Sequence, residues 1–259
     1  SIYDVDFSEK GRKLSSQAMA VIDAKPFKEK WSDVVAVLAP SEGSMMMGNL
    51  IGSAVSAENV NNRSSPWTDK VGDSVSHESL SVADNGRSEL GLMSAVIDDE
   101  GVPTMKTQVI EKGVLKSYIF DSYNANQLGL NSTGNGIRRG GRDAHGAFTG
   151  MVSCRPTTLE IPPGSKTVDE IISEVKRGVY IEHFAWPQVE ALSGAFSNEI
   201  RNARVIQNGE LKDQIKFALL VGNLYESIKK EMFFGADAEV HGTRVMPTYS
   251  IAGTELVGQ

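Results

Sequence analysis

Cysteine and positive charge are scarce in this sequence. One cysteine, Cys154, stands among 259 residues, so the chain cannot close an internal disulfide or supply a cysteine pair for a zinc site. A reducing cytoplasm is therefore the expected compartment. The 26 Lys and Arg are outnumbered by 33 Asp and Glu, which gives a net charge of −7. This balance, without a long basic stripe, argues against a surface that binds nucleic acid.

Long apolar runs are also lacking. No uncharged apolar stretch approaches the ~20 residues that a membrane-spanning helix needs, so we expect no membrane partner. The first residues carry charges throughout and show no signal peptide. The apolar fraction of 40% and the charged fraction of 23% are typical of a folded globular chain. The length fits one large domain or two smaller ones.

Hydrophobic spacing predicts a helix, a strand and a helix in the first sixty residues. The first helix follows Ser8 and ends near Lys25 and Pro26, because apolar residues recur there at helical spacing. A β-branched run over residues 33–39 predicts a buried strand. Ser41 is expected to cap the second helix.

The middle of the chain has β character. Between Trp67 and Phe120, four β-rich segments alternate with turn-forming residues, which predicts an antiparallel meander. One of these segments covers residues 92–98, and the acidic residues 98–101 after it are expected to form a hairpin turn and not a calcium loop. Residues 129–150 are rich in glycine and arginine and predict a long loop.

Local signals in the C-terminal part are the clearest. Thr167 and Glu170 have the spacing of a capping box, which predicts a helix that stops at Gly178. Asn208 and Gly209 predict a type I′ hairpin turn. A last helix is expected to begin around residues 222–223, and the alternating tail to form an edge strand. The fold class we predict is α+β, with a predominantly antiparallel β-sheet or barrel-like core and flanking helices.

The side chains alone do not define a catalytic site. The four histidines, His77, His145, His183 and His241, are too far apart in sequence for the paired imidazoles of a helical zinc site. Ordinary structural roles are the favoured interpretation, and a site assembled from distant histidines is the alternative.

The sequence offers two possible nucleophilic sites, and ordinary structural roles are favoured for both. The region of Ser193 and Ser197 lacks a G-x-S-x-G elbow. Cys154 could act as a nucleophile only if its surroundings lowered its pKa, and a buried, inert thiol is favoured.

A glycine-rich segment points to binding. Gly134, Asn135 and Gly136 precede Arg138, a composition that suits an oxyanion, a peptide backbone or a second subunit. A surface that contacts a partner is favoured over catalysis.

Six segments in register over residues 30–257 resemble the TldD/PmbA family, known as "putative modulators of DNA gyrase". The segment from Ser132 to Arg138 is similar to the family signature sTGNa-x-R. The others are residues 99–104, 113–115, 193–197, 206–210 and 222–224. Members of this family are longer, so the resemblance implies that residues 30–259 form their C-terminal domain. Residues 1–29 would then be a linker and helix that follow an N-terminal domain outside this chain.

The resemblance also carries expectations about metal. The family implies a cytoplasmic peptidase system in which TldD-type subunits bind metal through H-E-x-x-x-H on a helix and a later cysteine, whereas PmbA-type (TldE) partners lack these ligands. Here the corresponding helix, residues 45–58, has no histidine, and His241 stands near the position of the cysteine. The resemblance therefore implies a PmbA-type member without metal or other cofactor.

The predicted function is a catalytically inactive subunit of a peptidase complex that helps to bind or enclose peptide substrates. Its expected partner is a TldD-type subunit or a second copy of the chain. No residue is expected to be catalytic or to bind metal, and Asn135, Arg138 and His241 are predicted to contact peptide or partner. The alternatives are an active hydrolase that uses distant His, Asp and Glu or the serines at 193 and 197, and a dimeric binding protein without a peptidase role.

Overall fold

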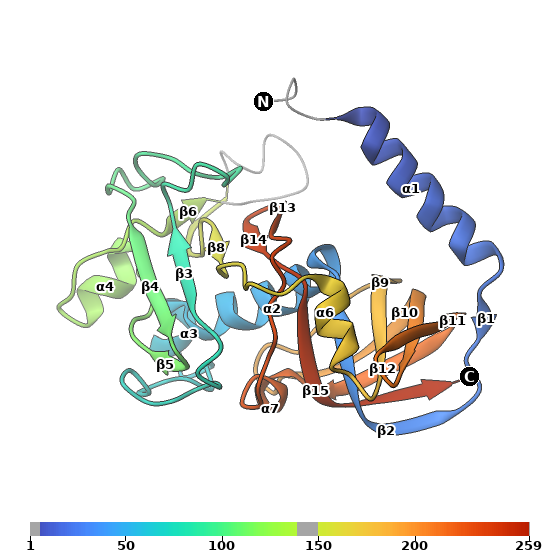
Figure 1. Ribbon diagram of the computed structural model, residues 1–259. Coiled ribbons are helices and arrows are strands. Elements are labelled where there is room, and N and C mark those ends of the chain that lie inside the picture. The colour runs from blue at the N-terminus through green and yellow to red at the C-terminus, as the bar shows by residue number, and fades with distance from the viewer. Residues whose placement is uncertain (1–5, 139–149, 259) are drawn as a thin grey trace.

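The computed structural model describes residues 6–138 and 150–258 (Figure 1). The helices are α1 (Phe7–Ile22), α2 (Pro40–Ala54), α3 (Ala57–Asn61), α4 (Ser122–Gln127), α6 (Val168–Ser173) and α7 (Leu224–Ser227). The first eight strands are β1 (Lys25–Pro26), β2 (Lys30–Leu38), β3 (Val82–Asn85), β4 (Lys106–Glu111), β5 (Val114–Leu115), β6 (Gly136–Arg138), β7 (Val152–Cys154) and β8 (Leu159–Glu160). The later strands are β9 (Arg177–Phe184), β10 (Ala195–Gln207), β11 (Glu210–Lys216), β12 (Ala218–Asn223), β13 (Glu239–His241), β14 (Arg244–Met246) and β15 (Tyr249–Gly258).

Five strands close into a barrel. Their order is β10-β12-β15-β2-β9, and β9 pairs back onto β10. Neighbours in this ring are antiparallel except β2 and β9, which are parallel. β11 and β1 extend this sheet beyond the barrel. The predicted α+β class with a barrel-like, mainly antiparallel core is thus confirmed.

A second sheet has the order β13-β14-β8-β3-β4-β5, with a parallel pair only between β14 and β8. Its β3-β4-β5 part is the predicted meander. Helix α2 lies between this sheet and the barrel (Figure 1). Because Met46, Met47, Leu50 and Ile51 of α2 are fully buried, a single core cluster joins the two sheets.

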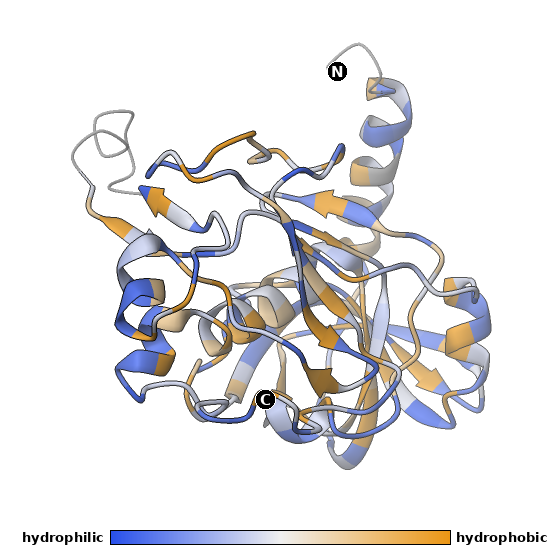
Figure 2. Cartoon of the chain, turned by 90° about the vertical axis from the view of Figure 1, so that its left-hand side faces the viewer, coloured by the Kyte–Doolittle hydropathy of each residue, from blue (hydrophilic) through white to orange (hydrophobic). Residues whose placement is uncertain are grey.

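Helix α1 projects from the rest of the molecule (Figures 1 and 2) and contacts the barrel sheet at β10 and β11, where Nζ of Lys216 donates a hydrogen bond to the Val21 carbonyl. Asp6 caps it through side-chain hydrogen bonds from the N–H groups of Ser8 and Glu9. Its apolar side chains Leu14 and Ile22 are each 66% exposed. The helix over residues 7–22 agrees with the first helix predicted from the sequence. Its role as a link to a further domain stays a prediction.

Two expected helix boundaries were wrong. The N-cap of α2 is Ala39, since Pro40 occupies the first helical position, where a missing N–H costs nothing. Helix α6 has the predicted capping box but ends at Ser173, and Gly178 belongs to β9. The last helix, α7, begins as predicted, with Asn223 as its N-cap, and spans Leu224–Ser227.

Two strand predictions and one loop prediction also need correction. Residues 92–98 form no strand, because local turns use their backbone groups, as when the Ser94 N–H donates to Gly91 O. The tail is not an edge strand: β15 lies between β12 and β2. The predicted loop at 129–150 contains β6, which pairs with β7; residues 139–149 lie outside the description.

The Asn208-Gly209 turn is confirmed. It joins β10 to β11, and its residues have φ of +52° and +79°. An added Cβ on Gly209 would lie 2.6 Å from the carbonyl oxygen of Ser173. The hairpin therefore depends on glycine both for its backbone angle and for its contact with the end of α6.

We predict that Gly209→Ala lowers the free energy of unfolding by at least 1–2 kcal/mol, roughly the cost of a left-handed conformation for a residue with a Cβ. Gly11→Ala is the matched control, since an added Cβ in α1 meets nothing within 4 Å. Urea unfolding followed by circular dichroism measures both changes. Equal stability of the Gly209 variant and the wild type would contradict the prediction.

Candidate functional site

A polar cleft of ≈ 400 Å³ runs along one side of α2, and we call it the α2 cleft. Helix α2 contributes four small or polar residues to it, and the opposite wall comes from the segment after β7 and from the β13–β14 hairpin. The lining residues are Gly48, Asn49, Gly52, Ser53, Ser56, Glu58, Asn59, Cys154, Arg155, Pro156, Leu159, Thr243 and Arg244. Its size is within the range of small-molecule sites.

Arg244 crosses α2 at Gly48. A Cβ added to Gly48 would lie 2.1 Å from Nε of Arg244 and 2.4 Å from its Cδ, so the side chain lies directly against the helix backbone. Its Nη2 donates a hydrogen bond of 2.7 Å to Oδ1 of Asn49. Glycine at 48 and the amide at 49 together fix a guanidinium group in the cleft.

The cleft does not fit a metal dication. Residues 48, 49 and 53, which have the H-E-x-x-x-H spacing and face the cleft, are Gly, Asn and Ser. Within residues 6–138 and 150–258, no group of three or more His, Cys, Asp and Glu could hold a metal ion. At an effective dielectric constant near 20, a guanidinium about 4 Å from a dication would add several kcal/mol of repulsion.

Asn135 is buried in a hydrogen-bonded network. Its Nδ2 donates to Oδ2 of Asp84 at 2.5 Å and to the carbonyl of Arg155 at 3.0 Å. Its Oδ1 accepts from the hydroxyl of Thr133 at 2.6 Å. The side chain therefore holds the 132–138 segment against β3 and the segment that follows β7, and its predicted contact with peptide or partner stays a prediction.

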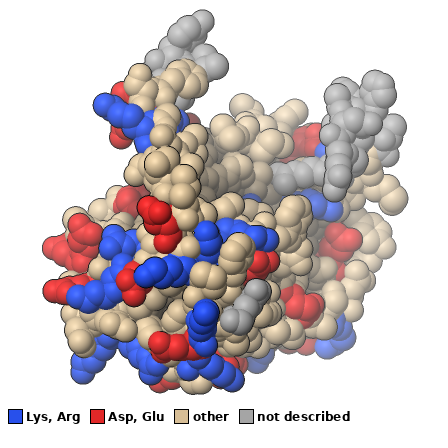
Figure 3. All heavy atoms as spheres, turned by 90° about the vertical axis from the view of Figure 1, so that its right-hand side faces the viewer, with Lys and Arg blue, Asp and Glu red and all other residues tan. Residues whose placement is uncertain are grey.

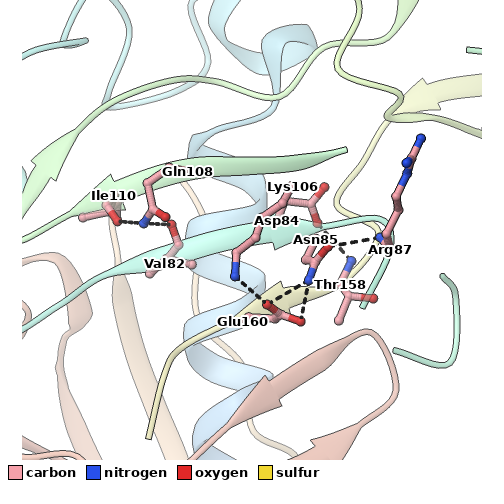
Figure 4. A network of polar contacts seen from close by, with 9 residues as sticks. All are labelled: Val82, Asp84, Asn85, Arg87, Lys106, Gln108, Ile110, Thr158 and Glu160. Carbon is pink, nitrogen blue, oxygen red and sulfur yellow. Dashed lines mark hydrogen bonds and ion pairs between the residues drawn. The ribbon is translucent and has the colours of Figure 1, made fainter. Parts of the chain in front are cut away.

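Asp84 is the centre of this network. Its carboxylate also accepts the N–H groups of Thr157 and Thr158 and the Thr157 hydroxyl, at 2.8–2.9 Å. Burial raises its pKa, and these hydrogen bonds partly oppose that shift. Beside Asp84 on β3, Asn85 donates to the carboxylate of Glu160 on β8 (Figure 4). The two residues connect β3 to β8 and to the glycine-rich segment.

The acidic turn at 98–101 holds β6 in place. Oδ2 of Asp98 accepts the Gly136 N–H at 2.9 Å, and Oδ2 of Asp99 accepts the Arg138 N–H at 2.6 Å. The predicted turn is confirmed by the Gly101 N–H to Asp98 O hydrogen bond. Arg138 itself is exposed, and its predicted contact with peptide or partner stays a prediction.

His241 lies elsewhere, in a second cavity of ≈ 590 Å³ between α1 and the barrel rim. Its Nε2 is 3.1 Å from Oε2 of Glu239, and Nδ1 of His183 is 3.3 Å from Oε1 of Glu42 in the same cavity. Glu182 and Asp237 add further carboxylates to the lining. The structure therefore does not bring Asn135, Arg138 and His241 into one site. That His241 contacts peptide or a partner stays a prediction.

The comparisons with known proteins define the family. The family model described as "PmbA/TldA metallopeptidase C-terminal domain" matches residues 32–258. The chain belongs to the TldD/PmbA family. A "Metalloprotease TldD homolog" from Haemophilus influenzae is 30% identical over 194 residues, which cover 75% of this chain and 39% of that protein. The chain thus spans less than half the length of this relative.

Two solved structures share the fold. A "putative modulator of a DNA gyrase" from Thermotoga maritima has a TM-score of 0.85 at 26% identity. TldE from Thermococcus kodakarensis has a TM-score of 0.86 at 24% identity. In each case the match covers 98% of this chain and 56% of the other. In this TldD/PmbA member, no helix of the described part is long and apolar enough to cross a membrane.

The alternative hydrolase residues are not assembled into a triad. The hydroxyl of Ser193 accepts the Ala195 N–H, and no hydrogen bond joins Ser193 or Ser197 to a histidine in the part of the chain that the structure describes. His77 is engaged with Ser79 at 3.0 Å, and His145 lies outside that part. Nothing in this geometry favours a nucleophilic serine.

The α2 cleft is the feature that sequence reasoning missed. Arg155 and Arg244 belong to no recognisable motif, and Gly48 lies in a helix that was predicted without a site. The available signal is the set of small residues at 48, 52 and 53 beside apolar Met47, Leu50 and Ile51, which indicates close approach of another element.

Cys154 is a buried thiol at the edge of the α2 cleft. It is 3% exposed, and its Sγ donates to the carbonyl of Ile119 at 3.0 Å. Burial raises the pKa of the thiol to about 11. Because the thiolate is the nucleophile, this environment disfavours cysteine catalysis near neutral pH.

We predict that Cys154 reacts slowly with a thiol reagent at pH 7.5 in the folded protein and stoichiometrically after unfolding in urea. The chain has one cysteine, so the absorbance of the released chromophore reports this residue alone. Complete labelling of the folded protein within the mixing time would contradict the buried, protonated thiol.

A second prediction concerns Asp84. Asp84→Asn places an amide NH₂ where Oδ2 accepts from Asn135 and Thr157, so donors face donors; we expect a loss of about 1–3 kcal/mol in the free energy of unfolding. Asp69→Asn, at a side chain that is 76% exposed, should change it by less than about 0.5 kcal/mol. Thermal unfolding of both variants is the measurement.

The pH dependence gives an independent check. Because the folded state raises the Asp84 pKa, it holds the proton where the unfolded chain has released it, so the Asp84 contribution to stability falls as pH rises from the ordinary aspartate pKa through the raised value. The Asn variant should lack this slope. Parallel pH profiles of the two proteins would refute the assignment.

Proposed function

We propose that this chain is a metal-free, catalytically inactive subunit of a TldD/PmbA-type peptidase assembly that helps to bind or enclose peptide substrates. The observation that carries the proposal is the guanidinium of Arg244 lying across Gly48 and bonded to Asn49 on the cleft side of α2. A hydrolytic metal site needs anionic or imidazole ligands in such a position, and this wall offers a cation and neutral side chains.

Exposed apolar surface supports the assembly part of the proposal. Phe7, Met19 and Ile22 of α1 and the loop residues Leu92 and Val96 are each more than 60% exposed. Exposed large apolar side chains are candidates for contact with another protein. The partner we propose is a TldD-type subunit, with a second copy of this chain as the alternative, and the fold shared with TldE is consistent with it.

Charge and cysteine content support two further elements. The net charge of −7 and the mixed charges on the barrel face (Figure 3) suit a peptide-handling subunit better than one that contacts nucleic acid directly. The single buried thiol suits a reducing compartment, and we propose the cytoplasm.

Metal analysis tests the inactive state. We predict that the purified chain contains far less than one zinc per molecule by mass spectrometry, cleaves no unfolded peptide alone, and is unaffected by a chelator. The proposal would be contradicted if the chain contained stoichiometric zinc and cleaved a peptide in a reaction that a chelator abolishes. If metal-independent cleavage occurs instead, its loss in Ser197→Ala or His241→Ala would favour the alternative hydrolase.

Co-purification tests the partner. Tagged chain expressed with a TldD-type subunit should elute with it in size-exclusion chromatography, and Val96→Asp or Ile22→Asp should weaken the complex. Tyr123→Asp, at another exposed side chain (68%), is the control. Separate elution of the two proteins at micromolar concentration would leave the peptidase connection without support.

A further inference from the structure

We propose that the α2 cleft binds the terminal carboxylate of a peptide, with Arg244 and Arg155 supplying the positive charge. The inference rests on the proposed function only for the class of ligand, a peptide. The proposal gives the α2 cleft, which lacks metal ligands, a role in binding.

The charge of the lining favours an anion. Arg155 and Arg244 are the cationic residues of the lining, and Glu58 is its one carboxylate, so its formal charge is 2 − 1 = +1 in a chain of net charge −7. Serine, threonine and asparagine side chains at 53, 56, 59 and 243 surround these charges. Carboxylates combine a negative charge with acceptor oxygens, which matches this set of groups.

The position of Arg244 is fixed before any ligand arrives. Contact with Gly48 and the hydrogen bond from Nη2 to Asn49 restrict its rotation. A held guanidinium loses less entropy on binding than a mobile one, and its planar fork matches a carboxylate in a bidentate arrangement. Arg155 is likewise held, since its Nε donates to the Ser153 hydroxyl at 2.7 Å.

The size of the cleft limits what it can hold. The volume of ≈ 400 Å³ accommodates the end of a chain and not a folded partner. The C-terminus of an unfolded peptide combines one charge, small size and a planar carboxylate, so it is the occupant we assign.

Fluorescence polarisation with three labelled peptides that differ only at the C-terminal residue or its end group tests the assignment. The first has a free C-terminal carboxylate, the second a C-terminal amide, and the third an amide with a glutamate as last residue. We expect the free acid to bind at least tenfold more tightly than the plain amide, with affinity falling as salt increases. Equal binding of acid and amide overturns the proposal. Equal binding of the free acid and the glutamate amide would show that a side-chain carboxylate serves equally well, and would overturn the assignment to the terminal carboxylate.

Variants locate the site. Arg244→Gln should lower the affinity for the free acid about tenfold, so that the free acid and the plain amide bind equally. Arg244→Lys should retain part of the preference for the free acid. Gly48→Ala should act like Arg244→Gln, because its Cβ displaces the guanidinium. Arg201→Gln, at an exposed arginine paired with Glu199 on the barrel, is the matched control and should leave binding unchanged. Thermal unfolding of each variant verifies that it is folded.

Competition separates the ligand chemistries. Acetate should displace the free-acid peptide at lower concentration than inorganic phosphate does; the reverse order would overturn the carboxylate assignment. Unchanged affinity in folded Arg244→Gln would overturn the site. These outcomes are independent of metal content and of a TldD-type partner. Carboxylate binding can therefore be disproved while the proposed inactive subunit stands, and the proposed function can be disproved while carboxylate binding stands.

Discussion

The burial of α2 between the barrel and the second sheet is the constraint on which the rest of the structure depends. Met46, Met47, Leu50 and Ile51 have no exposed surface and join the two sheets into one core. Three glycines let other elements reach the helix: Gly43 faces Tyr249 of β15, Gly48 faces Arg244 of β14, and Gly52 faces Pro156. Larger side chains at these positions would separate the elements that α2 brings together.

The same packing creates the cleft. Where α2 is apolar it is covered, and where its residues are Gly48, Asn49, Gly52 and Ser53 the covering elements leave a polar space. Cys154 at its edge is desolvated and protonated, so the space contains no thiolate at neutral pH. The charged and polar side chains of the cleft are then its two arginines, Glu58, and serine, threonine and asparagine residues.

How much the sequence predicted depended on the distance between the interacting residues. The Asn208-Gly209 turn and the Thr167–Glu170 capping box were predictable because their partners are within three residues. The central position of β15 was not, because the alternation of an edge strand and of a barrel strand is the same. The buried state of Asn135 was also hidden, since its partner Asp84 is 51 residues away in sequence. The cleft required Arg244 and Gly48 to meet across 196 residues.

Arginine in the α2 cleft separates two tasks that a metal ion performs together. A dication attracts anionic groups and also lowers the pKa of bound water, so it both holds a substrate and generates a nucleophile. A guanidinium stays protonated at any physiological pH and offers N–H donors in a fixed plane, so it can hold a carboxylate but cannot activate water. In the subunit that we propose, Arg244 beside Gly48 would therefore keep peptide binding while hydrolysis depends on a partner that carries metal.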